Sequence, residues 1–472
     1  MEDSEPMAMK RRDAEQQGEL WIPTNQIAAS PGHPFYDHLN RLLAREGFDR
    51  FVEAHCATFY HERLGRPSIP PGVYFRMLLI GYFEGLASER EIAWRCADSL
   101  ALRTFLGYRL TQTTPEHSSL SRIRQRIDAE THAAVFTWVL KVVAKHDLLK
   151  GQTIGIDATT LEANAAMRSI VRRDSGEDYQ AFLTRLAKAS GIETPTQADL
   201  VRLDRKRKKK ASNKEWQNPH DPDAKITQMK DGRTHLGHKA EHAVDLDTGA
   251  IVAVTLEGAD QGDTTTVYAT VVEAGEQLRE VADDETAGEA LAGGFLKEVV
   301  ADKGYHSNET TRDFAEMAIR TYISEPGRGR RHWKGKPDEQ AAVYANRRRV
   351  RGTRGKALLR QRGEFLERPF AHCYETGGMR RTHLRGHAKI LKRLLIHVAG
   401  FNLALVMRSM LGVGTPRGLA DLSVALSSLA HGPAWLSHAV FTLVRRPPGV
   451  LTAWVSRRSV ARPPVQPLPA AA

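Results

Sequence analysis

The chain has 472 residues and a mass of 52.6 kDa, with 68 Lys or Arg against 56 Asp or Glu, so its formal net charge is +12. A content of 41% hydrophobic and 26% charged residues is typical of globular proteins and argues against wholesale disorder. Three cysteines without a C-x-x-C pair exclude a disulfide scaffold and a thiolate zinc site, and no apolar run reaches the length of about 18 residues that a membrane span requires. The basic charge favours an acidic partner, first of all nucleic acid.

The first part of the chain is predicted to be mainly helical. Residues 1–20 lack periodicity and are expected to form a disordered tail, and residues 21–150 a helical domain. An apolar run from Arg76 to Leu86 predicts a buried helix, and Ser88 with Glu91 has the spacing of a capping box at the next helix start. Short helices joined by tight turns can form a DNA-binding helix-turn-helix, and a plain helical bundle is the alternative.

Strands and helices alternate between residues 151 and 412, which predicts an α/β domain. The predicted strands and helices, in chain order, are strands 153–159, 238–247 and 250–257, helix 265–282, strand 295–301, helix 308–318, strand 320–324 and helices 358–372 and 389–411. The polar and basic segment 168–230 is predicted to be a helical insertion with flexible parts. Residues 413–472, rich in Pro, Arg and Ala, are expected to form a disordered tail.

Two basic segments, 202–214 and 327–362, are candidates for DNA contact, with a solvated surface as the alternative. Contacts to phosphate give affinity that falls steeply with salt and carry little sequence information. The strongest candidates for such contacts are Arg205, Lys206, Arg207, Lys208, Lys209, Lys210, Arg347, Arg348 and Arg349. Trp216 and Trp333 lie next to these segments and could stack on bases, although packing in a core is the more common role of tryptophan.

Three acidic residues occupy positions that suggest chemistry. Asp157 and Asp302 each follow a short apolar strand, and Glu367 lies on a predicted helix. An Asp at the end of a buried strand is costly unless a partner compensates its charge. Together the three would form an oxygen-only site of the kind that Mg²⁺ or Mn²⁺ prefers. Two such ions about 4 Å apart can activate a nucleophile and stabilise the leaving oxygen of a phosphodiester.

Other polar residues have simpler interpretations. His235, His238 and His242 have metal-like spacing, but no matching Cys or acidic pattern accompanies them, so a zinc site is not expected. Tyr305 and His306 follow Asp302 directly and could either contact DNA near the cut or pack at the end of the strand. Exposed positions of hairpins and solvated turns are predicted for four acids: Asp245, Asp247, Asp260 and Asp263.

Three segments together resemble the acidic motifs of DDE-class bacterial insertion-sequence transposases: Ile156–Asn164, Val300–Tyr305 and Phe365–His372. Further segments that are similar to parts of this family are Arg66–Leu79, Lys230–Lys239 and Arg380–Gly386. The resemblance is ordered along the chain and covers residues 20–412.

The resemblance implies an RNase H-like catalytic domain with a helical N-terminal DNA-binding domain and a basic helical insertion. It places Asp157 on the first strand, Asp302 on the fourth and the glutamate on the last long helix, where the three bind two Mg²⁺ or Mn²⁺ ions. Water, and then a DNA 3′-hydroxyl, would attack phosphodiesters at the ends of the element and in target DNA. The implied partners are double-stranded DNA and a second copy of the chain on paired ends, in the cytoplasm at the nucleoid and without a membrane.

The third carboxylate has an alternative. Glu364 lies three residues before Glu367, and Arg360 lies four before Glu364, as the related signature Tyr-x2-Arg-x3-Glu-x6-Lys requires. However, Ala357 and Ala371 occupy the tyrosine and lysine positions of that signature, so Glu367 is preferred.

Two other functions compete with transposition. One is a metal-dependent nuclease on the same fold that does not join strands. The other is a regulatory or decayed DNA-binding protein without catalytic activity. The presence of all three acids favours the two enzymatic readings.

Overall fold

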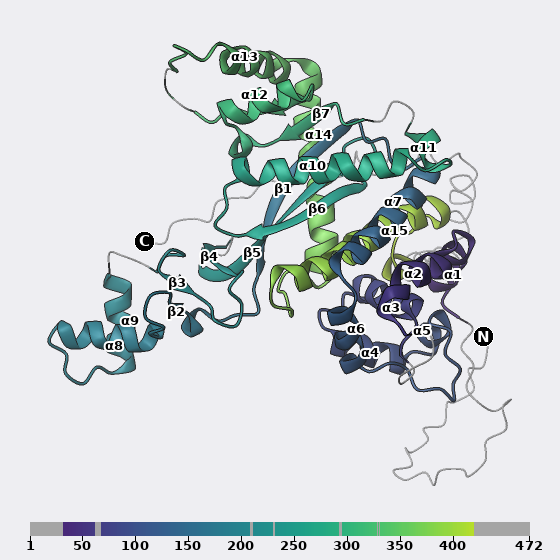
Figure 1. The fold of residues 1–472 in the computed structure, drawn as a ribbon, viewed down its shortest axis with the longest axis horizontal. Helices are drawn as coiled ribbons and strands as arrows, with labels where there is room; N and C mark the ends of the chain where they lie inside the picture. Colours follow the sequence, from purple (N-terminus) through teal and green to yellow (C-terminus); the bar gives the residue numbers. More distant parts are fainter. Residues whose placement is uncertain are drawn as a thin grey trace, which may run out of the picture. The chain divides into compact units, whose positions relative to one another are not determined.

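The computed structural model describes residues 32–61, 68–207, 211–229, 232–291, 295–327, 329 and 331–419. The chain divides into two compact units, Met1–Val406 and Met407–Ala472. The first unit contains a group of N-terminal helices and a mixed α/β region (Figure 1). The disordered tails predicted at residues 1–20 and, apart from 413–419, at residues 413–472 lie outside the described residues.

The N-terminal part is helical, as predicted. Helix α3 is buried on nearly all sides because its sequence is apolar all round, and it ends at Gly85, whose φ is +68°. Ser88 caps the next helix and exchanges hydrogen bonds with Glu91, which confirms the predicted capping box. The elements are α1 (Pro34–Arg45), α2 (Phe48–Cys56), η2 (Ala57–Phe59), α3 (Pro71–Glu84), α4 (Glu89–Asp98), α5 (Leu100–Phe105), α6 (His117–Arg126) and α7 (Ala129–Lys145).

A six-stranded mixed sheet forms the centre of the α/β region. Strand β5 pairs antiparallel with both β6 and β1, and β7 pairs parallel with both β1 and β8. Strand β4 pairs antiparallel with the first residues of β5. The sheet therefore has the order β6-β5-β1-β7-β8, with β1 in the middle. The strands are β1 (Thr153–Glu162), β4 (Lys225–Gln228), β5 (Thr234–Asp245), β6 (Ile251–Gly258), β7 (Glu298–Ala301) and β8 (Arg320–Ile323).

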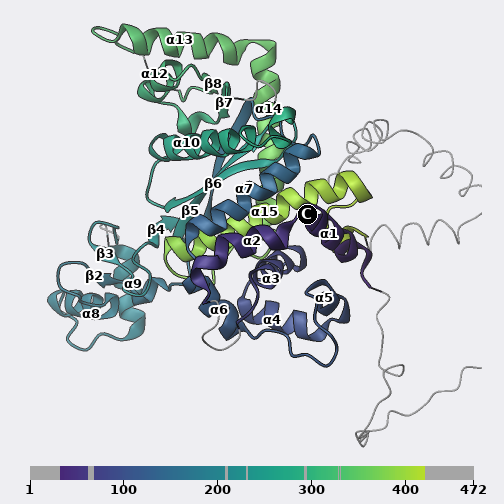
Figure 2. The ribbon, with the colours of Figure 1, turned by 45° about the vertical axis from the view of Figure 1, so that its right-hand side comes forward.

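Helices cover both faces of this sheet (Figures 1 and 2). On β5, His242 contacts Tyr374 of the segment after α14, whereas its neighbour Glu241 accepts hydrogen bonds from Thr266 and Thr270 of α10. Because successive strand residues point to opposite faces, α10 and α14 lie on opposite sides of the sheet. The elements are α10 (Asp263–Ala282), α11 (Ala287–Ala290), η4 (Lys303–Tyr305), α12 (Asn308–Glu316), α13 (Pro337–Arg351), α14 (Thr353–Phe370), the π-helical turn η5 (Ala371–Thr376) and α15 (His387–Leu411).

The segment between β1 and β5 forms a small lobe with its own core. Trp216 is only 2% exposed and contacts the rings of Tyr179 and Phe182 edge-on, so it packs in this core and the base-stacking alternative is wrong for it. The predicted insertion 168–230 is also too long, because β4 belongs to the main sheet. The elements of the lobe are η3 (Met167–Ser169), β2 (Val171–Arg172), α8 (Tyr179–Ala189), α9 (Gln197–Lys206) and β3 (Trp216–Gln217).

One helical stretch among the described residues, His387–Leu419, is long and apolar enough to cross a membrane. However, 72% of its most apolar window is buried inside the structure, as in the core helix of a globular domain. Such a single buried helix is weak support for a membrane span.

Replacing Trp216 with Ala should destabilise the lobe by about 3–5 kcal/mol, because a large buried side chain would be lost from a small core. Urea denaturation followed by circular dichroism measures the change. Trp94→Ala is the matched control, since Trp94 is 71% exposed and its removal should change the free energy of unfolding by no more than about 0.5 kcal/mol. Equal losses in the two variants would contradict the packing described for Trp216.

Candidate active site

Asp157 lies in the middle of β1 on the face that α14 covers. Its Oδ1 accepts a hydrogen bond from the Ala158 amide, and its Oδ2 lies 3.0 Å from Nη2 of Arg362. Burial raises the pKa of Asp157, and the negative charges of Asp302 and Asp263 act in the same direction, while Arg362 opposes them. Burial thus makes the charged form of the Asp157 carboxylate costly, and Arg362 offsets part of that cost.

Asp302 is brought beside Asp157 by the register of two parallel strands. Gly155 on β1 pairs with Val300 on β7, so Asp157 and Asp302, each two residues further along, lie next to each other. Nη2 of Arg362 is 4.0 Å from Oδ2 of Asp302 and also contacts Asp157. The structure therefore brings together two of the three predicted carboxylates.

Arg362 occupies the space between these two carboxylates. It comes from α14, is 12% exposed at its side chain, and also donates from Nε to the Ile156 carbonyl at 3.1 Å. A guanidinium is a cation, so its position marks a place where a positive charge is stabilised by two oxygen ligands from Asp157 and Asp302. These two residues fit a hard divalent cation, which prefers carboxylate oxygens.

Glu367 is not part of a three-carboxylate cluster. Within the described residues, no group of three or more His, Cys, Asp or Glu side chains is close enough to hold a metal ion. Glu367 is exposed on α14. It lies three residues before Phe370 and seven before Tyr374, so it is close to the side of the helix that carries these two rings. Phe370 and Tyr374 contact His242, and His242 pairs directly with Asp157 on the neighbouring strand.

Glu364 lies on a different side of α14. At 3.6 residues per turn it is rotated by about 200° from both Arg362 and Leu366, which point to the sheet. Its carboxylate instead forms an exposed ion pair with Arg368. The helix geometry thus places Glu367 nearer to the face of the two aspartates than Glu364.

A further acid, Asp263, lies close to Asp302 and to the turn after β7. The Oδ1 of Asp302 accepts from the Gly304 amide at 2.8 Å, and a side chain at Gly304 would collide with both Asp263 and Asp302. Asp263 begins α10 and accepts from Nζ of Lys239 at 2.6 Å. The predicted solvated turn is therefore wrong for Asp263, which is ion-paired beside the candidate site.

Glu241 forms a buried polar centre on the α10 side of the sheet. Its carboxylate has no exposure and accepts hydrogen bonds from Thr266, Thr270 and the Tyr305 hydroxyl, with Lys239 Nζ 3.7 Å away. Tyr305 belongs to the turn after Asp302, so Glu241 fixes that turn against β5 and α10. Sequence reasoning missed Glu241 and Lys239, and it left Tyr305 open between packing and DNA contact; the structure shows that Tyr305 packs.

The histidines that share a metal-like spacing have separate surroundings. Nε2 of His238 lies 3.4 Å from Asp221, whereas Nε2 of His242 lies 2.6 Å from the Tyr374 hydroxyl. His235 lines a cavity at the edge of the sheet. Burial lowers the pKa of His242 to about 3, so this ring is neutral at physiological pH.

Asp245 is buried, which contradicts the prediction of an exposed hairpin residue. Its carboxylate accepts hydrogen bonds from the amides of Lys150, Gly151 and Asp247. Burial raises the pKa of Asp245 and these backbone donors oppose that effect. Asp245 thus joins the start of β1 to the turn between β5 and β6.

A cavity of about 510 Å³ lies along the second half of β1, and its lining begins at Ala158, the residue after Asp157. Its lining includes Thr159, His235, Lys239, Asp263 and Arg380. Nη1 of Arg380 donates to Thr159 Oγ1 at 2.9 Å, so this residue ties β1 to the segment that follows the π-helical turn. The cavity wall therefore carries charges of both signs, among them Lys239, Arg380 and Asp263.

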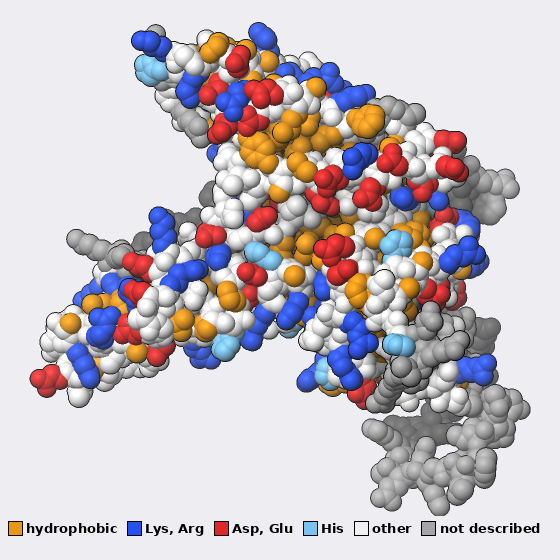
Figure 3. Space-filling model, in the orientation of Figure 1, with side chains coloured by type: hydrophobic (Ala, Val, Ile, Leu, Met, Phe, Trp, Pro, Cys, Tyr) orange, Lys and Arg blue, Asp and Glu red, His pale blue; other side chains and the backbone are white. Residues whose placement is uncertain are grey.

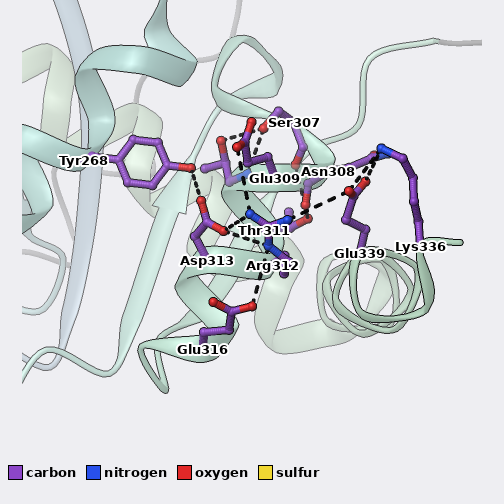
Figure 4. Close-up of polar contacts among 11 residues, drawn as sticks. Tyr268, Ser307, Asn308, Glu309, Thr311, Arg312, Asp313, Glu316, Lys336 and Glu339 are labelled. Carbon is purple, nitrogen blue, oxygen red and sulfur yellow. Dashed lines mark hydrogen bonds and ion pairs between the residues drawn. The ribbon is translucent and has the colours of Figure 1, made fainter.

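A network around Arg312 fixes the helix that follows the Asp302 turn (Figure 4). Arg312 on α12 pairs with Asp313 at 2.6 Å and approaches Glu339 of α13 at 4.0 Å. The Tyr268 hydroxyl of α10 donates to Asp313 at 2.8 Å. These contacts link α12 to α10 and α13 next to the turn that carries Asp302.

The predicted DNA-contact residues of the first basic segment differ in their surroundings. Arg205 and Lys206 are exposed at the end of α9, whereas Arg207 donates to Asp204 and to the Tyr179 hydroxyl. Lys208, Lys209 and Lys210 lie outside the described residues.

In the second basic segment, only one of the three predicted arginines is exposed. Arg347 pairs with Glu325 at 2.9 Å, and Arg349 donates to the Thr321 carbonyl at 2.9 Å. Arg348 is exposed on α13. Figure 3 shows that Lys and Arg side chains are mixed with Asp and Glu across the visible face.

Asp157→Asn should raise the midpoint of thermal unfolding at pH 7 in the absence of divalent cations. Because burial raises the Asp157 pKa, the stability linked to its protonation is present below about 3.9, the pKa of an unfolded Asp, and is lost as pH rises through the folded pKa. The difference between variant and wild type should therefore shrink as pH falls through the raised folded pKa, and it should be gone below about 3.9. Asp260→Asn, at an exposed residue, should show no such pattern, and a wild type as stable as Asp157→Asn at pH 7 would refute the expectation.

Residues 24–126 match the family model of a transposase domain (DUF772), and residues 203–403 match that of the transposase DDE domain. The second match contains Asp302 and Glu367 but begins after Asp157, which the structure places in the same sheet. No curated protein and no solved structure matches the chain. With both domains in order on one chain, the protein belongs to the DDE transposases of insertion sequences.

Proposed function

We propose that this transposase binds the terminal inverted repeats of its insertion sequence and catalyses Mg²⁺-dependent DNA strand cleavage and strand transfer. The observation that carries the proposal is the pairing of Asp157 and Asp302 around one cationic position, on adjacent parallel strands of a chain that matches transposase families. The sheet order β6-β5-β1-β7-β8, antiparallel before β1 and parallel after it, supports an RNase H-like catalytic domain.

The proposed catalytic residues and metal ligands are Asp157, Asp302 and Glu367. Two Mg²⁺ or Mn²⁺ ions held by them would activate the attacking oxygen and stabilise the leaving oxygen. The carboxylates of Asp157 and Asp302 already share one cationic partner, the Arg362 guanidinium, which supports their role as ligands of a cation. Glu367 lies one to two helical turns from Arg362 on α14, so the same helix would supply both the third ligand and the resting counter-ion.

Positively charged surfaces would hold the DNA. The net charge of +12 and the exposed Arg205, Lys206 and Arg348 support phosphate contact. Lys208–Lys210 are proposed as further phosphate contacts on their sequence alone. The cavity beside Asp157 could receive part of the strand at the cut. We propose the domain boundaries 21–150, 151–412 and 413–472, a homodimer on paired ends, and action at the nucleoid in the cytoplasm.

The test is a cleavage and joining assay with supercoiled DNA that carries the element's own ends. Asp157→Asn, Asp302→Asn and Glu367→Gln should each lose strand cleavage by on the order of 10³-fold or more, because each removes a ligand from one unit. Gel-shift binding to the ends should persist in all three variants, which shows that they remain folded. Glu364→Gln is the matched control on the same helix and should retain most of the activity.

Other outcomes would select the alternatives. Cleavage without joined products would indicate a nuclease on the same fold, and specific binding without cleavage in the wild type would indicate a regulatory or decayed protein. Activity that survives Glu367→Gln but not Glu364→Gln would assign the third ligand to Glu364.

A further inference from the structure

A second cavity lies away from the carboxylates, among the start of α4, the end of α6 and the segment that leads into α15. Its volume is about 310 Å³. Its polar lining includes Ser88, Glu89, Arg124, Arg381 and Arg393. Among the described residues that line it, Glu89 is the only acid, so cations outnumber acids on its wall.

Arg393 brings a buried charge to this cavity. The residue is 6% exposed; its Nη2 donates to the Leu86 carbonyl at 3.1 Å, and its Nη1 is buried without a hydrogen-bond partner. Gly81 makes room for the guanidinium, because a side chain there would collide with Nη2. Burial lowers the pKa of Arg393 to about 10, so the side chain remains charged at neutral pH.

Arg124 adds a second unsatisfied donor. Its Nε donates to Glu89 at 2.6 Å, but its Nη1 is also buried without a partner. Lys392 lies behind it and donates to the carbonyls of Arg124 and Ile127 at the end of α6. Arg124 and Arg393 therefore share one carboxylate on the cavity wall, Glu89, and each keeps a buried donor without a partner, which is costly unless an anion is bound.

The cavity has the features of an anion site. Buried arginines favour oxyanions through charge-assisted hydrogen bonds, and the N-terminus of α4, capped by Ser88, adds a favourable dipole. Arg381 stands at the rim with its side chain 59% exposed. We propose that this cavity binds one phosphate group and, given the proposed function, that the phosphate belongs to the DNA backbone.

Such a contact would link two parts of the chain on DNA. Arg124 comes from the N-terminal helices, whereas Arg381 and Arg393 follow the helix that carries Glu367. A backbone phosphate, with its single negative charge, would offset part of the positive charge of this cavity and hold the N-terminal helices against the region behind the candidate site. The cavity is thus a positioning contact for DNA and carries no sequence information of its own.

The first test uses inorganic phosphate and the full chain at constant ionic strength. Thermal unfolding of the wild type should shift upward with phosphate and saturate, since a ligand bound only by the folded state stabilises it. Arg393→Gln should abolish the shift. Arg381→Gln should raise the half-saturating phosphate concentration about threefold or more, because it removes one charged donor at an accessible rim.

Arg385→Gln is the control, because Arg385 is exposed in the same segment and does not line the cavity. If Arg393→Gln does not fold, Arg381→Gln against Arg385→Gln decides the test. No saturable shift in the wild type, or equal shifts in these two variants, would overturn the anion site.

The second test separates free phosphate from DNA. Binding of a duplex without element ends is measured over a range of salt concentrations and without divalent cations. Arg381→Gln should reduce the slope of log affinity against log salt by about 1, whereas Arg385→Gln should leave it unchanged. Saturable phosphate binding with an unchanged slope in Arg381→Gln would overturn the DNA assignment. Neither measurement involves cleavage, so failure of this proposal and failure of strand transfer are distinguishable.

Discussion

Two like charges on neighbouring parallel strands are the constraint around which the catalytic region is organised. Asp157 and Asp302 repel each other, and partial burial adds a desolvation cost that raises the pKa of Asp157. Arg362 compensates both at once, and it can do so only because α14 crosses this face of the sheet. The position of α14 in turn determines where Glu367 projects, so the counter-ion and the proposed third ligand are set by one helix.

The opposite face of the sheet stabilises the same geometry by a different means. Glu241 and Lys239 form a buried ionic centre with Asp263 and the Tyr305 hydroxyl. Buried ion pairs of this kind contribute little net stability, and their clearest effect is to define position. Here the hydrogen bond from Tyr305 to Glu241 fixes the turn after β7 and with it the position of Asp302 beside Asp157.

The sequence predicted the elements that alternate regularly, and it placed Asp302 correctly just after an apolar strand, whereas Asp157 lies within β1. It did not predict the burial of Glu241 and Asp245, because a polar residue within a strand normally indicates an exposed face. Charge runs also do not show which cations have partners within the protein: Arg347 pairs with Glu325, and Arg349 donates to the Thr321 carbonyl. These partners lie far along the chain, and only the tertiary fold identifies them.

The attachment of the lobe between β1 and β5 has a consequence for how this protein can diverge. β1 pairs with β5 as far as Glu162 opposite Gly237, and the chain that leaves the sheet there re-enters it at β4, which pairs with the first residues of β5. Loop-closure entropy grows slowly with length, by only about 0.6 kcal/mol for each doubling. A lobe with its own core around Trp216 can therefore be lengthened, trimmed or exchanged while Asp157 keeps its register against His242. The lobe can thus evolve as a module on an unchanged sheet.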